Sequence, residues 1–132
     1  MVREAQMSAL RSVPEREFRL RLADHLRSEY PRAVQHLGDS DLINRVEVGL
    51  LRARAYSFGN RSSEAAFVAL MFTVAPNFDE HPKIRQLLTE SHVPPDARLA
   101  HLADAITLEE WVQARDAGNE NAWRIVSRAA VL

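Results

Sequence analysis

The chain has 132 residues, of which 46% are apolar and 27% are charged, and its 17 basic and 18 acidic side chains give a net charge of −1. This composition is typical of a soluble globular protein, and the balanced charge argues against nucleic-acid binding. The chain contains no cysteine, which excludes disulfides, thiolate metal sites and cysteine nucleophiles. No apolar run reaches about 18 residues and the N-terminus lacks a signal-peptide pattern, so we expect a cytoplasmic protein without membrane contact.

Apolar residues recur at helical spacing nearly throughout the chain. The pattern predicts an all-α fold, a single compact domain of six or seven short helices that spans residues 1–132. Within it, residues 1–11 form either a separate short helix or a frayed extension. A capping box at Ser12 and Glu15 predicts a helix that stops before Pro31. Its apolar stripe consists of Phe18, Leu22, His25 and Leu26.

The next segments predict a short helix and then a central one. Pro31 begins the short helix, which Gly38 closes, and Asp39 or Ser40 caps the central helix. The central helix should end at Ser57 or Phe58, with Gly59 as the residue that stops it. Its apolar stripe is wide, and Gly49 within it predicts close approach by another helix. The stripe consists of Ile43, Val46, Leu50, Leu51, Ala53, Ala55 and Phe58.

The rest of the chain also follows a helical pattern. Ser62 or Ser63 begins a helix that ends before Pro76, and residues 75–82 form an irregular connection. Asp79 is expected to cap a helix beginning at Pro82. Further helices are expected to start at Pro94-Pro95, at a capping box of Thr107 and Glu110, and after Gly118-Asn119, where a closing helix carries Ala122, Trp123, Ile125, Val126 and Ala129.

No pattern in the sequence indicates catalysis or a cofactor. The five histidines are scattered, and no pair has the i, i+4 spacing of two metal ligands on one helix. Phosphate loops, nucleophile elbows and dinucleotide-binding motifs are absent. We therefore expect no catalytic residue, no metal site and no cofactor, and a protein that is not an enzyme.

Two arginines and a tyrosine, expected on one side of the central helix, have two interpretations. Arg52, Arg54 and Tyr56 could form a binding surface, because Arg and Tyr are enriched at interfaces. Alternatively, Arg54 pairs with an acidic residue while Tyr56 packs its ring and hydrogen-bonds its hydroxyl. Trp111 and Trp123 are expected to be core anchors.

Three segments between Phe18 and Pro82 carry a family resemblance. They are Phe18…Leu22-Ala-Asp-His-Leu26…Tyr30-Pro31, Arg54-Ala-Tyr56-Ser-Phe-Gly59, and Ser63-Glu64…Leu70-Met71-Phe72…Ala75-Pro-Asn-Phe-Asp-Glu-His-Pro82. About half of the chain thereby resembles small helical bacterial proteins encoded near effectors of type VI secretion systems. At Lys83-Ile84-Arg85 it departs from the Trp-Ala pair that such proteins often carry. The resemblance implies an accessory role in loading, stabilising or neutralising an effector.

The expected function is therefore that of a non-enzymatic adaptor or co-chaperone whose partner is a secreted effector or the effector's chaperone. The expected partner-binding residues are Arg52, Arg54, Tyr56, Phe78 and Asp79. An immunity protein that neutralises a toxin is one alternative, since residues 67–132 carry 6 basic and 9 acidic side chains. A small helical DNA-binding regulator is the other.

Overall fold

The computed structural model describes residues 14–124, and within this range the fold is all-α, with no strand. The elements are α2 (Glu15–Glu29), α3 (Pro31–Val34), α4 (Asp39–Arg54), α5 (Arg61–Thr73), the 3₁₀ helix η1 (Phe78–Glu80), α6 (Pro82–Leu88), α7 (Pro95–Ala105) and α8 (Leu108–Asp116). The predicted short helix at 1–11, the predicted cap Ser12 and most of the predicted closing helix lie outside the described residues. Residues 122–124, at the start of that closing helix, are helical.

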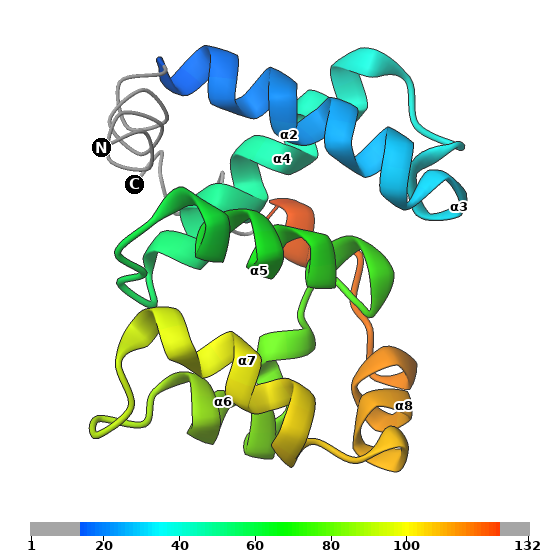
Figure 1. Ribbon diagram of the computed structural model, residues 1–132. Helices are drawn as coiled ribbons and strands as arrows, with labels where there is room; N and C mark the ends of the chain where they lie inside the picture. Colours follow the sequence, from blue (N-terminus) through cyan, green and yellow to red (C-terminus); the bar gives the residue numbers. More distant parts are fainter. Residues whose placement is uncertain (1–13, 125–132) are drawn as a thin grey trace.

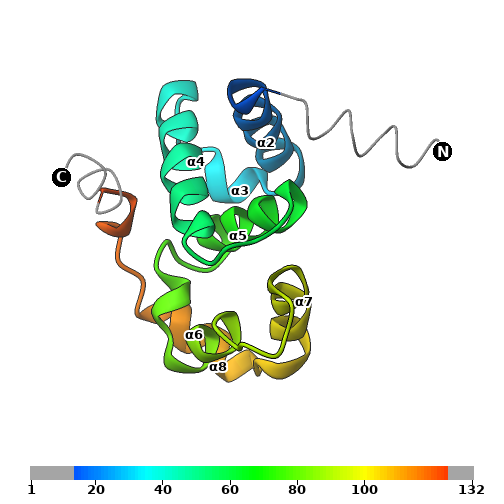
Figure 2. The same cartoon turned by 90° about the vertical axis from the view of Figure 1, so that its left-hand side faces the viewer.

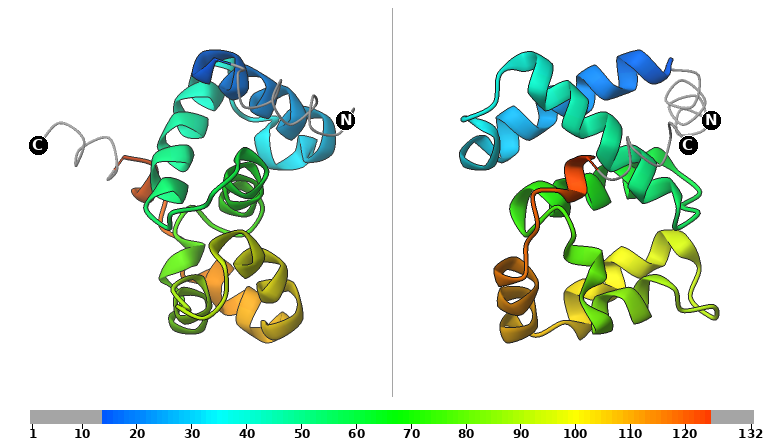
Figure 3. Two further views of the ribbon diagram at one scale, coloured as in Figure 1. Left: turned by 60° about the vertical axis from the view of Figure 1, so that its left-hand side comes forward. Right: turned by 180° about the vertical axis from the view of Figure 1, so that it is seen from behind.

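The helices form two halves that meet at α5 (Figure 1). In one half α4 packs against α2 and α5, and the short α3 connects α2 to α4. In the other half α6 packs against α7 and η1, and α8 packs against η1. Figure 2 shows α5 lying between the pair α2 and α4 above and the helices α6 to α8 below. After α8 the chain returns to the first half, where its last described turn lies beside α4 and α5 (Figure 3).

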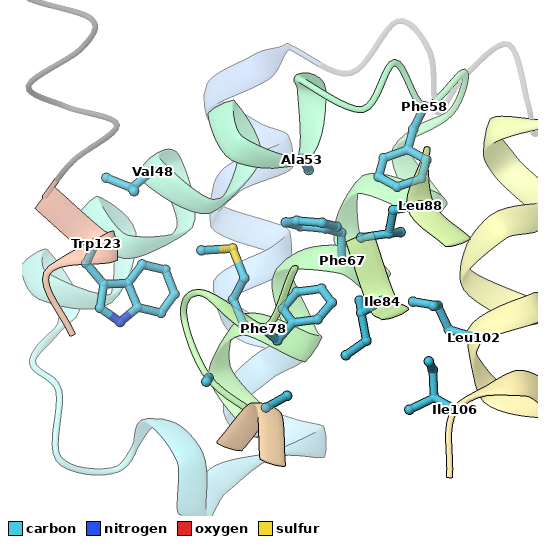
Figure 4. Close-up of a cluster of buried hydrophobic side chains, with 13 residues drawn as sticks. Val48, Ala53, Phe58, Phe67, Phe78, Ile84, Leu88, Leu102, Ile106 and Trp123 are labelled. Atoms are coloured by element: carbon cyan, nitrogen blue, oxygen red, sulfur yellow. The ribbon is translucent and has the colours of Figure 1, made fainter. Parts of the chain in front are cut away.

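Two clusters of buried apolar side chains correspond to these halves. The first-half cluster contains Phe18, Leu22, Ala23, Leu26, Val34, Leu42, Val46, Leu50 and Val68. The larger cluster, drawn in Figure 4, contains Val48, Ala53, Phe58, Phe67, Met71, Ala75, Phe78, Ile84, Leu88, Leu102, Ile106, Ala114 and Trp123. Helices α4 and α5 supply side chains to both clusters, so both helices are buried on more than one face.

The close approach predicted at Gly49 is confirmed. A Cβ atom built on Gly49 would lie 3.1 and 3.2 Å from the two methyl carbons of Val68 and 3.4 Å from the sulfur of Met71, both on α5. These distances leave almost no room for a side chain. Because Gly49 has no side chain, Val68 and Met71 of α5 can pack directly against the backbone of α4.

The predicted ends of the central helix are wrong at both sides. Gly38 is the N-cap of α4 and Asp39 is already helical, with its carboxylate paired to Arg27 rather than capping the helix. The helix ends at Arg54, and the left-handed residue beyond it is Ser57, with φ of 63°, not Gly59. Gly59 has a different role, because its N–H donates to both carboxylate oxygens of Asp96 at 3.0 and 3.2 Å.

Other local predictions have mixed outcomes. The capping box of Thr107 and Glu110 is confirmed, with both reciprocal hydrogen bonds present. Helix α5 begins at Arg61, one residue before the predicted Ser62, and is capped by Asn60, whose side chain accepts from the N–H of Ser63. His25 is exposed rather than part of the buried stripe of α2. The stripe of α4 is also narrower than predicted, since Leu51 is 46% exposed.

Candidate functional site

A buried carboxylate joins the end of α4 to η1. Arg52 and Tyr56 stand four residues apart and therefore point to the same side of the chain. The Nε atom of Arg52 donates to Asp79 Oδ1 at 2.8 Å, and the hydroxyl of Tyr56 donates to Asp79 Oδ2 at 2.6 Å. Asp79 is only 2% exposed, so each of its oxygens is satisfied by a side chain rather than by water.

The surroundings of Tyr56 keep its hydroxyl protonated. Burial raises the pKa of Tyr56, and the hydrogen bond and negative charge of Asp79 raise it further, while the Arg85 guanidinium acts in the opposite sense. The pKa therefore lies well above the ordinary value of 10.0. At neutral pH Tyr56 is a hydrogen-bond donor to Asp79.

The network continues from η1 to the end of α8. The second guanidinium nitrogen of Arg52 donates to Glu80 Oε2 at 3.3 Å, and the amide of Asn77 donates to Glu80 Oε1 at 3.2 Å. The same amide donates to the carbonyl of Ala117 at 3.1 Å, while Asn77 Oδ1 accepts from the backbone N–H of Asn119 at 2.7 Å. One asparagine side chain thus fixes the chain where it leaves α8.

Arg54 belongs to a separate ion-pair group on the other side of the helix. Its guanidinium donates to Glu15 at the start of α2 and to Glu64 in the first turn of α5, at 3.1 Å for the Nε–Glu64 contact. Partial burial acts to raise the pKa of Glu15, but hydrogen bonding and charge attraction from Arg54, aided by Arg61 and Arg19, outweigh it and lower the pKa. Arg54 therefore holds the N-terminal ends of α2 and α5 together.

The expectation that Arg52, Arg54 and Tyr56 share one side of the helix is wrong. Residues two positions apart on a helix point in nearly opposite directions, so Arg54 contacts α2 and α5 while Arg52 and Tyr56 contact η1. The alternative interpretation, in which Arg54 pairs with acids and the Tyr56 hydroxyl is hydrogen-bonded, describes what the structure shows.

Phe78 and Asp79 lie away from solvent in this conformation. Phe78 is 0% exposed and its ring centre lies 4.9 Å from that of Phe67 in the core. Asp79 does not cap α6, whose N-cap is His81 and has no side-chain cap, because the Asp79 carboxylate is bound to Arg52 and Tyr56. Neither residue offers a surface to a partner while η1 stays in place.

His81 is held between η1 and α8. Its Nε2 atom lies 3.0 Å from the side-chain oxygen of Gln113, and its buried Nδ1 atom has no hydrogen-bond partner among the described residues. In the same described range, no group of three or more histidine or acidic side chains is placed to hold a metal ion. The role of His81 is to connect α8 to the N-terminus of α6.

Sequence reasoning missed Asn77, Asn119 and Glu64 as members of these networks. Asn77 and Asn119 are 42 positions apart, and no spacing rule relates residues across η1, α6, α7 and α8, which lie between them. The sequence signal for this network was the irregular connection at residues 75–82, in which Asn77 follows Pro76. It indicated a turn but not the partners of its side chains.

Comparisons with family models, with curated proteins and with solved structures find no significant match to this chain. Among residues 14–124, no helix combines the length and the apolar character needed to cross a membrane.

Proposed function

We propose that this chain is a non-enzymatic accessory protein that binds a secreted effector of a type VI secretion system, or the chaperone of that effector. The proposal is supported by the use that the fold makes of its buried polar residues. Arg52, Asp79 and Tyr56 satisfy one another and connect two helical segments, which gives them a structural role. Their arrangement leaves the outer surfaces of the helices for contact with other molecules.

The residues of the resemblance agree with such a scaffold. Tyr56, Gly59, Phe78 and Asp79 match recurring positions of the family that this chain resembles. Here Tyr56 is hydrogen-bonded to Asp79 of η1, and Phe78 packs on Phe67 of α5. Large apolar side chains also stand on the outside of the helices, as binding surfaces require. Among these side chains are Tyr30, Leu51 and Leu108, which are 39%, 46% and 80% exposed.

Co-expression tests this function directly. The tagged chain is produced together with the product of each neighbouring gene, and complexes are purified and sized by size-exclusion chromatography. We expect a stable complex with an effector or an effector chaperone, with roughly 800 Å² buried on each side. A chain that elutes alone after co-expression with every neighbour would overturn the proposal.

A toxicity assay separates an adaptor from an immunity protein. Cells that produce the effector found in the complex are grown with and without this chain. An adaptor loads or stabilises the effector and is not expected to restore growth, whereas an immunity protein restores it by blocking the toxic site. Full restoration of growth would contradict the adaptor role.

A further inference from the structure

A groove lies between α4 and the segment that follows α8, with a volume of about 380 Å³. Its lining residues are Asn44, Arg45, Glu47, Val48, Leu51, Trp123 and Arg124. Val48 and Trp123 are its buried apolar lining residues, and Figure 4 shows both at one edge of the larger core cluster. Leu51 stands in the same groove but is 46% exposed, so the apolar surface continues outward from the core.

The wall formed by Trp123 is fixed by contacts to two helices. The ring of Trp123 lies 4.8 Å from that of Phe72 on α5, and the Arg45 guanidinium of α4 stands 5.3 Å from its centre. The Arg45 guanidinium also pairs with the carboxylate of Glu120, three residues before Trp123 in the chain, at 3.3 Å. A groove with a fixed wall is preformed, so binding to it costs little conformational entropy.

The charges around the groove favour an acidic ligand. Two arginines and one glutamate line it. Glu47 is paired with Arg19 at 3.5 Å and Arg45 is paired with Glu120 at 3.3 Å, which leaves the charge of Arg124 among these lining residues. Arg124 is exposed and has no acidic partner within residues 14–124. An acidic group entering the groove would therefore find an arginine whose charge no described side chain neutralises.

We propose that this groove is the docking site for an acidic segment of the partner protein, with a large apolar side chain on Leu51 and Trp123 and a carboxylate on Arg124. The inference rests on the proposed binding function and specifies its surface. The chain's own residues 125–132 follow Arg124 directly, but they contain one arginine and no acidic side chain. Charge complementarity therefore selects a partner over this segment.

Two matched leucines allow a controlled test on the complex isolated by co-expression. Leu51 and Leu20 are both 46% exposed, but Leu20 lies on α2, away from the groove. We expect Leu51→Glu and Arg124→Glu each to weaken binding of the captured partner by about tenfold or more, as loss of a central contact does. Leu20→Glu should bind within about twofold of the unmodified chain, and circular dichroism checks that all variants are folded.

The possible results separate the two proposals. A partner captured equally well by the Leu51→Glu and Leu20→Glu chains would overturn the groove assignment and leave the binding function intact. An unmodified chain that captures no partner would overturn both. Binding that strengthens in Arg124→Glu would contradict the acidic character proposed for the ligand.

Photocrosslinking identifies the occupant without relying on weakened variants. A photoreactive phenylalanine analogue is placed at position 51 of the full chain, with position 20 as the control, and the products are mapped by mass spectrometry. A crosslink from position 51 to an acidic segment of the partner is expected. A crosslink to residues 125–132, or to a second copy of this chain, would show that another occupant fills the groove and would overturn the proposal.

Discussion

At the scale of single residues, Asp79 is the most deeply buried of the polar side chains in residues 14–124. Asp79 accepts from Arg52 and from Tyr56, and the three side chains join two segments that are more than twenty positions apart in the chain. Separation of a buried pair is costly because it leaves a charge without a partner, by about 3–5 kcal/mol. The network therefore specifies where η1 docks on α4.

Substitution of Tyr56 measures how much its hydrogen bond to Asp79 contributes to the stability of the fold. Tyr56→Phe retains the ring but leaves Asp79 Oδ2 without its donor, so we expect the free energy of unfolding to fall by about 1–3 kcal/mol. Tyr30→Phe is the control, because Tyr30 is 39% exposed and its hydroxyl has water available. Urea denaturation of the two variants gives the values, and equal stability of both would refute the role assigned to Tyr56.

The ion pair of Glu15 with Arg54 makes a pH-dependent contribution. The pKa of Glu15 is lowered in the folded chain, so its stabilising effect is present above its ordinary pKa of 4.5 and is lost as the pH falls through the lowered value. The melting temperature of the unmodified chain should fall when the pH is lowered from about 6 to about 3. We expect a smaller fall for Glu15→Gln, because that variant has no carboxylate at position 15 to protonate. Identical drops would show that this pair does not couple folding to protonation.

At the scale of elements, the contact of α4 with α5 depends on one small residue. Gly49→Ala would gain about 1 kcal/mol of helix propensity, but the new methyl group meets Val68 at 3.1 Å. Val68 is 0% exposed and branched at Cβ, so it has little freedom to move away. The crowding is therefore expected to exceed the gain.

Thermal denaturation can test this balance. We expect Gly49→Ala to lower stability by about 1 kcal/mol net, since overpacking in a core costs about 1–3 kcal/mol. Gly38→Ala provides the comparison for crowding, because a Cβ at Gly38 has no neighbour within 4 Å. Alanine is a weaker N-cap than glycine, so this variant should lower stability by about 0.5 kcal/mol without any crowding. A Gly49→Ala chain more stable than the Gly38→Ala chain would contradict the packing argument.

The sequence predicted the helices well and their junctions poorly. Periodicity located α2, α4 and α5, and local pairing rules identified the capping box of Thr107 and Glu110, since both depend on neighbours within one or two turns. The pairing of Asp79 with Arg52 and Tyr56 depends on how η1 docks, which short-range spacing does not encode. For the same reason Asp79 looked like a helix cap, and Gly59 like a helix stop rather than a binding point for Asp96.

At the scale of the whole molecule, the two core clusters share helices and are not independent. Val46 and Leu50 of α4 belong to one cluster while Val48 and Ala53 of the same helix belong to the other. Loss of either cluster would expose one face of α4. The two halves should therefore unfold together.

The two tryptophans can report this coupling. Trp123 belongs to the larger cluster and also contacts Arg45 of α4 and Phe72 of α5, whereas Trp111 lies on α8 and packs against the larger cluster. We expect Trp111→Phe and Trp123→Phe, each with one fluorescent probe left, to unfold in urea with fluorescence midpoints that coincide with the circular-dichroism midpoint of the same chain. Separate midpoints for fluorescence and circular dichroism would show that the halves unfold one after the other.

The docking of Trp123 also affects how this protein folds while it is being synthesised. Arg45 and Glu120, which secure that docking, are 75 positions apart in the chain. At synthesis rates of about 5–20 residues per second, roughly 4–15 s pass between the production of these two residues. During that interval the outer face of α4 that Trp123 covers stays open on the nascent chain. This part of the fold therefore forms only after residues 120–123 have been synthesised.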